Sequence, residues 1–157
     1  MQKLFLSTLL LCFASLLAVK ADPDLTKPLD IKFTSVDGRD VDISKLRGKV
    51  VLVDFWATWC PPCRGEVPNV VAAYNKYHDK GFEIIGISLD QDKSSLVSFT
   101  KDHDMTWPQD FEDGDNKFAE TYGIQFIPAM WLVGKDGKVI TTDAREDLAG
   151  AIEKALK

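Results

Sequence analysis

Residues 50–56 are the feature that most constrains what this chain can fold into. They read VVLVDFW, a run that is apolar except for one acid. A continuous apolar run of this length is typical of a strand buried on both faces, as the central strands of parallel sheets are. Pro61 then begins a stretch to about Lys80 in which apolar residues recur three and four positions apart, which predicts a helix. Together the two segments indicate an α/β domain.

The remaining segments predict the other elements of that domain. Apolar and polar residues alternate on both sides of Asp37-Gly38, which indicates an N-terminal β-hairpin with Val41 and Ile43 in its second strand. We expect a second buried strand at 82–89, helices at 94–102 and 116–122, strands at 129–133 and 139–142, and a closing helix at 146–156. This order predicts a central mixed sheet flanked by helices, with the hairpin at its start and a helical insertion in the middle.

The first 21 residues carry the features of a secretory signal peptide. Lys3 gives a positive start, an uncharged apolar run follows to Val19, and Ala21 is a small residue of the kind that a signal peptidase recognises. We therefore expect residues 1–21 to be a signal peptide and residues 22–157 to be one exported domain. The alternative is an uncleaved N-terminal membrane anchor, since this uncharged run of 16 residues falls only a little short of the roughly 20 that span a bilayer.

Charge and cysteine content narrow the classes of function. The chain has a net charge of -5, which becomes -7 without residues 1–21, so it lacks the basic excess that nucleic-acid binding requires. Only Cys60 and Cys63 remain after residue 21. Structural disulfides usually close long loops, whereas this pair closes a loop too short to restrain much of the chain. The pair therefore indicates chemistry and not scaffolding.

The C-x-x-C pair falls where the buried strand passes into the helix. Cys60 lies at or just before the helix N-terminus, where unpaired amides and the helix dipole stabilise a thiolate. Cys63 follows one helical turn later, so the pair can cycle between a dithiol and a Cys60–Cys63 disulfide. We expect no cofactor and no metal, because a structural zinc site needs four ligands and His78 and His103 are remote from the pair in sequence.

Two stretches resemble the TlpA/ResA-like exported thioredoxins of the thioredoxin superfamily. They are GKVVLVDFWATWCPPCRGEVP at 48–68 and YGIQFIPA at 122–129, and the resemblance extends from about Leu29 to the C-terminus. It implies a thioredoxin fold and a thiol-disulfide oxidoreductase. In that family Cys60 would be the attacking thiol and Cys63 the resolving one, and Pro128 would be a cis-proline facing the disulfide. Client proteins would bind at Trp59, Pro61, Phe126, Ile127 and Pro128.

Two carboxyls match acids of related active sites. Glu66 occupies the place of the active-site acid of the TlpA/ResA-like family, and Asp54 that of the buried acid of ordinary thioredoxins. An acid in an apolar strand has a raised pKa, so Asp54 suits the acceptance and return of the Cys63 proton. The alternatives are that Asp54 is a hydrogen-bonded core acid without a role, and that Glu66 is a solvated helix residue.

The same residues bear on other chemistries and on the direction of electron flow. A peroxiredoxin would need proline at Val53 and threonine at Ala57, so the sequence disfavours it, and a non-catalytic binding module would not need both cysteines and both acids. Pro61 and Pro62 add no charge between the cysteines, which favours a reductase over an oxidase or isomerase with the same cysteines. The resemblance implies protein clients with disulfides, among them apocytochrome c, and a membrane electron donor. We expect a periplasmic or other extracytoplasmic monomer.

Overall fold

The computed structural model describes residues 23–113 and 116–157. The predicted signal peptide, residues 1–21, lies outside the described residues. In the described part of the chain, no helix combines the length and apolar character needed to cross a bilayer.

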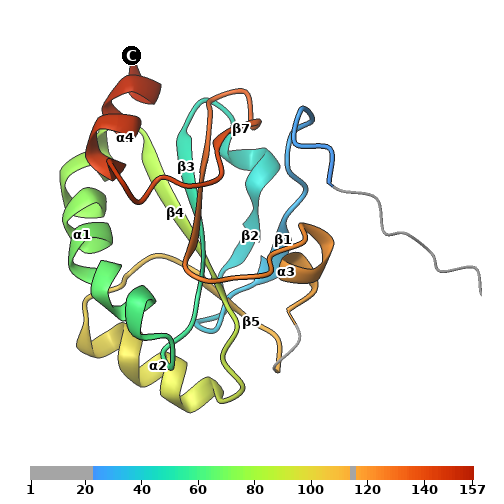
Figure 1. Cartoon of the computed structure of the whole chain (residues 1–157), viewed down its shortest axis with the longest axis vertical. Helices are drawn as coiled ribbons and strands as arrows, with labels where there is room; N and C mark the ends of the chain where they lie inside the picture. The colour runs from blue at the N-terminus through green and yellow to red at the C-terminus, as the bar shows by residue number, and fades with distance from the viewer. Residues whose placement is uncertain (1–22, 114–115) are drawn as a thin grey trace, which may run out of the picture.

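A five-stranded sheet forms the centre of the domain (Figure 1), and its middle strand is the apolar run of the sequence. This strand, β3 (Val50–Trp56), is buried along its whole length. The sheet order is β5-β4-β3-β6-β7, in which β3 is parallel to β4 and antiparallel to β6. The other strands are β4 (Phe82–Ser88), β5 (Gln109–Phe111), β6 (Ala129–Val133) and β7 (Val139–Thr141). The predicted mixed sheet is confirmed.

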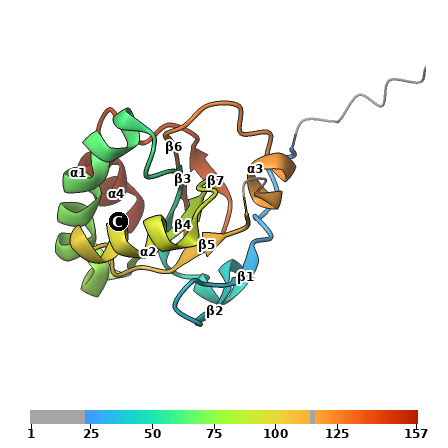
Figure 2. The same cartoon turned by 90° about the horizontal axis from the view of Figure 1, so that it is seen from below.

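The two faces of β3 belong to two separate cores, because successive side chains of a strand point to opposite sides. Leu52 and Trp56 belong to the core beneath the helices α1 (Pro61–Tyr77), α2 (Lys93–Asp102) and α4 (Leu148–Leu156). Val51, Val53 and Phe55 belong to the second core. It lies beneath the hairpin of β1 (Lys32–Thr34) and β2 (Asp40–Asp42) and the short helix α3 (Lys117–Thr121), seen on the opposite side of the sheet in Figure 2.

Both cores and all the described helices and strands lie between Leu29 and Leu156. The central strand contributes to both cores, so the two layers stabilise one sheet. A protein that begins at residue 22 therefore contains every described helix and strand.

Three predicted boundaries are wrong. The second hairpin strand ends at Asp42, because the Asp42 side chain accepts a hydrogen bond from the Ser44 amide and so begins the 3₁₀ helix η1 (Ile43–Leu46), which takes Ile43 out of the strand. The first long helix ends at Tyr77, and its predicted last turn is the 3₁₀ helix η2 (His78–Lys80). The last helix begins at Leu148 and not at residue 146, because Asp147 caps it.

The strand β5 has no counterpart in the sequence prediction. It has three residues, and its first two, Gln109 and Asp110, are polar yet buried. Their burial is possible because the Trp56 indole donates to Gln109 Oε1 at 3.0 Å and the Asn116 amide donates to Asp110 at 2.7 Å. Trp56 lies 53 residues away in sequence, and both bonds are made by side chains, so local hydrophobic alternation cannot reveal the strand.

Candidate active site

The two cysteines lie at the start of α1, directly after the carboxyl end of β3. Cys60 is the N-cap residue of the helix and forms a disulfide with Cys63, with an S–S distance of 2.06 Å and a Cα–Cα distance of 5.3 Å. Each of these residues is only 3% exposed. The predicted placement of Cys60 at the helix N-terminus and the predicted pairing are both present in the structure.

The prolines between the cysteines determine which amides can reach Cys60. The first two helical positions are Pro61 and Pro62, which have no N–H group. The first available amide is that of Cys63, which donates to Cys60 Sγ at 3.3 Å. Cys60 therefore receives the positive end of the helix dipole together with one backbone donor from the first three helical residues.

The loop before β6 closes one side of the disulfide. Its peptide bond between Ile127 and Pro128 is cis, as the resemblance implies, and the Ile127 carbonyl oxygen lies 3.8 Å from Cys60 Sγ. Trp59, next to Cys60, is 61% exposed, and Phe126, next to Ile127, is 84% exposed. The disulfide therefore lies between two segments that each expose a large apolar ring.

Asp54 is an acid within the core on the helix side of the sheet. It follows Leu52 and precedes Trp56 on that face of β3, and it is 6% exposed. No described side chain or backbone group forms a hydrogen bond or ion pair with its carboxyl group. Burial, with a smaller contribution from the charge of Glu66, raises the pKa of Asp54 to about 7. The Asp54 carboxyl is therefore a buried acid whose charge is stabilised by no described hydrogen-bond donor.

Glu66 lies one helical turn beyond Cys63 and is half-buried. Its carboxylate accepts a hydrogen bond from Asn69 Nδ2 at 3.1 Å and interacts electrostatically with Asp54 and with Arg145. The structure thus places Glu66 on the helix that carries both cysteines and within electrostatic reach of Asp54. Their participation in proton transfer remains a prediction.

Asp90 supports the loop before Cys60, and the sequence prediction did not include it. This buried acid accepts hydrogen bonds from the Thr58 amide at 3.1 Å, from Thr58 Oγ1 at 2.6 Å and from Ser88 Oγ at 2.8 Å. An available signal was its position two residues after β4, because the carboxyl ends of the parallel strands β3 and β4 meet at one edge of the sheet. Asp90, which follows the neighbouring strand β4, therefore stabilises the loop before Cys60 by these hydrogen bonds.

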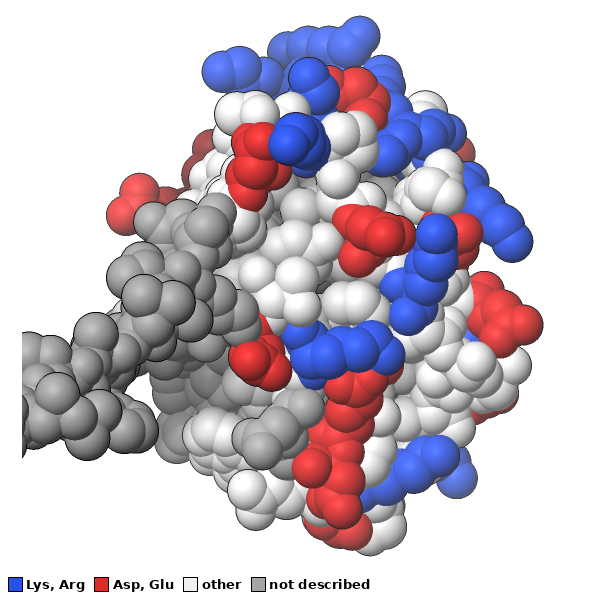
Figure 3. Space-filling view, turned by 90° about the vertical axis from the view of Figure 1, so that its right-hand side faces the viewer, with Lys and Arg blue, Asp and Glu red and all other residues white. Residues whose placement is uncertain are grey.

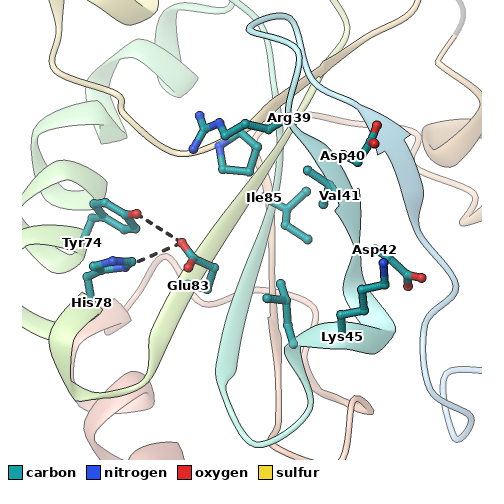
Figure 4. Close-up of a pocket in the computed structure, with 11 residues that line it drawn as sticks. Arg39, Asp40, Val41, Asp42, Lys45, Tyr74, His78, Glu83 and Ile85 are labelled. Carbon is teal, nitrogen blue, oxygen red and sulfur yellow. Dashed lines mark hydrogen bonds and ion pairs between the residues drawn. The ribbon is translucent and has the colours of Figure 1, made fainter.

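A pocket of about 370 Å³ lies at the other end of α1, away from the cysteines (Figure 4). There the Tyr74 hydroxyl donates to Glu83 at 3.2 Å and His78 Nδ1 lies 3.7 Å from the same carboxylate. Burial and the charge of Glu83 raise the pKa of Tyr74 to about 12. Glu83 also accepts from the Ile84 amide at 3.3 Å, so this cluster covers the part of β4 beyond its pairing with β5. None of the predicted site residues lines this pocket.

Comparison with known proteins decides the family. The Redoxin family matches residues 19–156. The chain belongs to this family. It is 35% identical over 124 residues to the thiol-disulfide oxidoreductase ResA of Bacillus thuringiensis subsp. konkukian, covering 79% of this chain and 71% of that protein. ResA of Bacillus subtilis is 30% identical over 104 residues, covering 66% of this chain and 58% of that protein.

Solved structures of similar proteins share the fold. The thioredoxin domain of a thiol-disulfide oxidoreductase from Bacteroides vulgatus is 32% identical and superposes with a TM-score of 0.74, covering 82% of this chain and 94% of that one. A thiol:disulfide interchange protein from Bacteroides sp. is 31% identical, with a TM-score of 0.71 over 82% of this chain and 87% of that one. The chain has a thioredoxin fold, and it is a thiol-disulfide oxidoreductase related to ResA.

Proposed function

We propose that this Redoxin-family protein is an exported thiol-disulfide reductase that acts on protein disulfides outside the cytoplasm. The observation that carries the proposal is Cys60 Sγ at the N-cap of α1, bonded to Cys63 and receiving a single amide from the first helical turn. A strong oxidant needs a reduced thiolate that is stabilised much further. One amide and two uncharged prolines provide only moderate stabilisation, which supports reduction of clients.

The first step is attack on a client disulfide. In the dithiol form the Cys60 thiolate attacks one client sulfur, a Cys60–client bond forms, and the client S–S bond breaks. The other client sulfur leaves as a thiolate and takes a proton from solvent. The helix N-terminus stabilises the attacking thiolate, because the amide of Cys63 points at Cys60 Sγ.

The second step releases the client. Cys63 gives its proton to a carboxylate, and its thiolate attacks Cys60 Sγ. This forms the Cys60–Cys63 disulfide and releases the second client thiolate, so the client gains two electrons and the cysteine pair loses two. Asp54 suits the role of proton acceptor, because its pKa of about 7 lets it exist in both protonation states near neutral pH. Glu66 acts with Asp54, since its negative charge helps to raise the pKa of Asp54.

The client binds across the two exposed rings. Trp59 and Phe126 offer apolar contact on either side of the disulfide, and Pro61 is exposed next to Cys60. The backbone of Ile127 and Pro128, beside Cys60 Sγ, receives the client chain as an extended segment. A protein chain, and not a small molecule, fits this surface.

The partners and location follow from the same chemistry. A reductase outside the cytoplasm must be returned to its dithiol form, so we include a membrane-bound thiol-disulfide electron donor, with residues 1–21 as the export signal or anchor. Apocytochrome c, with its own C-x-x-C thiols, is a suitable client. The proposal includes action as a monomer.

The test of the exchange chemistry is covalent trapping. Cys63→Ser leaves Cys60 able to attack but removes the group that releases the client. We expect mixed disulfides between this variant and client proteins in cells, visible on non-reducing gels and lost on reduction. The double variant Cys60→Ser/Cys63→Ser is the matched control and should trap nothing. Absence of trapped species with Cys63→Ser, at normal expression, contradicts the proposed function.

A further inference from the structure

Four chain segments meet at the end of the domain opposite the disulfide. Residues 45–49 precede β3, residues 78–81 precede β4, and residues 134–138 follow β6, which runs antiparallel to both. The Gly48 amide donates to the Lys135 carbonyl at 2.9 Å, and Lys135 Nζ donates to the Leu156 carbonyl at 2.7 Å, which adds residues 153–157. The sheet topology therefore gathers these loops into one surface, which we call the basic pole.

The charge of the chain is divided unevenly between this pole and the rest. The four segments hold eight basic and three acidic side chains, whereas the remainder of residues 22–157 holds nine basic and 21 acidic ones. Figure 3 shows Lys and Arg gathered over the upper end of the molecule, the end where Figure 1 places the C-terminus. The basic side chains are Lys45, Arg47, Lys49, Lys80, Lys135, Lys138, Lys154 and Lys157.

The distance between the basic pole and the disulfide determines which charges of the domain an external surface interacts with. The seven residues of β3 separate the two ends, and a strand of this length spans roughly 20 Å. At physiological ionic strength charges are screened beyond about 8 Å. Among the basic side chains of the pole, Lys49 is paired with Glu83 of β4 at 3.4 Å. An anionic surface lying against the pole is attracted by the other basic side chains and hardly repelled by the acidic residues near the disulfide, although the whole domain is negative.

We propose that the basic pole docks on an anionic lipid membrane, with the disulfide facing away from it. The positive charges come from separate loops and not from one pocket, which fits a diffuse layer of lipid headgroups. A redox partner protein must instead reach Cys60 at the other end of β3, so the pole stays free while the cysteines react. The inference does not depend on the direction of the proposed redox reaction.

The test is sedimentation of the oxidised domain, residues 22–157, with lipid vesicles. We expect binding to vesicles of phosphatidylcholine with one third phosphatidylglycerol at low salt, weaker binding as salt is raised, and little binding to pure phosphatidylcholine. Lys135→Gln/Lys138→Gln should weaken binding by roughly 25-fold, because each basic residue near such a surface changes the affinity about fivefold. Both side chains are exposed, so the fold should tolerate their loss.

The matched control is Lys93→Gln/Lys101→Gln, which removes the same charge from two exposed side chains on α2. It should change vesicle affinity less than twofold. Circular dichroism and the rate of disulfide reduction should be unchanged in both variants. Equal loss of binding in the two variants overturns the proposal. Absence of sedimentation at low salt also overturns it.

Discussion

Asp54 is the residue whose protonation couples most strongly to folding. Its pKa is about 7 in the folded protein and near 3.8 in an unfolded chain, so between these pH values the folded state retains a proton that the unfolded state has lost. Stability contributed by this residue is therefore present below about pH 4 and is lost as the pH rises to 7. The loss amounts to at most about 4 kcal/mol.

Asp54→Asn should remove this pH dependence. We expect the free energy of unfolding of the variant, relative to the native protein, to increase from pH 4.5 to pH 8, because the amide does not ionise. Urea unfolding of the oxidised proteins at several pH values measures it. Asp79→Asn, which removes an exposed carboxyl of η2, is the control. Its free energy of unfolding should depend on pH in the same way as that of the native protein. A parallel curve for Asp54→Asn would show that its carboxyl is not the titrating group.

Glu66→Gln tests the coupling between the two acids. The negative charge of Glu66 helps to raise the pKa of Asp54, so its removal should lower that pKa, by less than one pH unit because burial is the larger cause. Carbon-13 NMR of the Asp54 carboxyl across pH 4 to 9 reports the change directly. Glu146→Gln removes one carboxylate before α4 and should leave the pKa of Asp54 unchanged. An unchanged titration in Glu66→Gln returns Glu66 to the role of a solvated helix residue.

At the scale of elements, the contact of β4 with β5 depends on Gly86, which has no side chain. A Cβ added at Gly86 would lie 1.9 Å from Gln109 Oε1 and 2.5 Å from Gln109 Cδ. Gln109 is buried and accepts the Trp56 indole hydrogen bond, so it cannot move without breaking that bond. Gly86→Ala should therefore destabilise the protein by about 2–4 kcal/mol in urea unfolding.

Gly65 provides the matched substitution. It lies in α1, is exposed, and an added Cβ would meet nothing within 4 Å. Gly65→Ala should stabilise the protein by about 0.5–1 kcal/mol, because alanine is the better helix former. Destabilisation by both substitutions would show that the close approach at Gly86 is not the cause.

The same elements show what the sequence can and cannot reveal. The sequence alone predicts β3, β4 and α1, because a continuous apolar run and a helical repeat are local patterns. It does not reveal β5, whose two buried polar residues form side-chain hydrogen bonds with Trp56 and Asn116. It also does not reveal Asp90, whose importance depends on Thr58 of a neighbouring loop.

At the scale of the whole molecule, the sequence indicates the redox pair and the structure supplies its surroundings. Cys60, Cys63 and the Ile127–Pro128 loop could be selected by motif, and the structure brings the sulfur of Cys60 within 3.8 Å of the Ile127 carbonyl. The segregation of basic residues at the opposite pole appears only after the topology brings four separated segments together. The net charge of the chain is negative, and it does not reveal that basic residues gather at one end.

The midpoint potential of the Cys60–Cys63 pair tests the central claim most directly. Residues 22–157 would be equilibrated in thiol-disulfide buffers of graded potential, and the dithiol fraction would be counted by alkylation and mass spectrometry. A reductase with one amide donor and no charge between its cysteines should have a potential close to that of thioredoxin, about −270 mV. A value near about −120 mV would contradict the account and identify a disulfide oxidant.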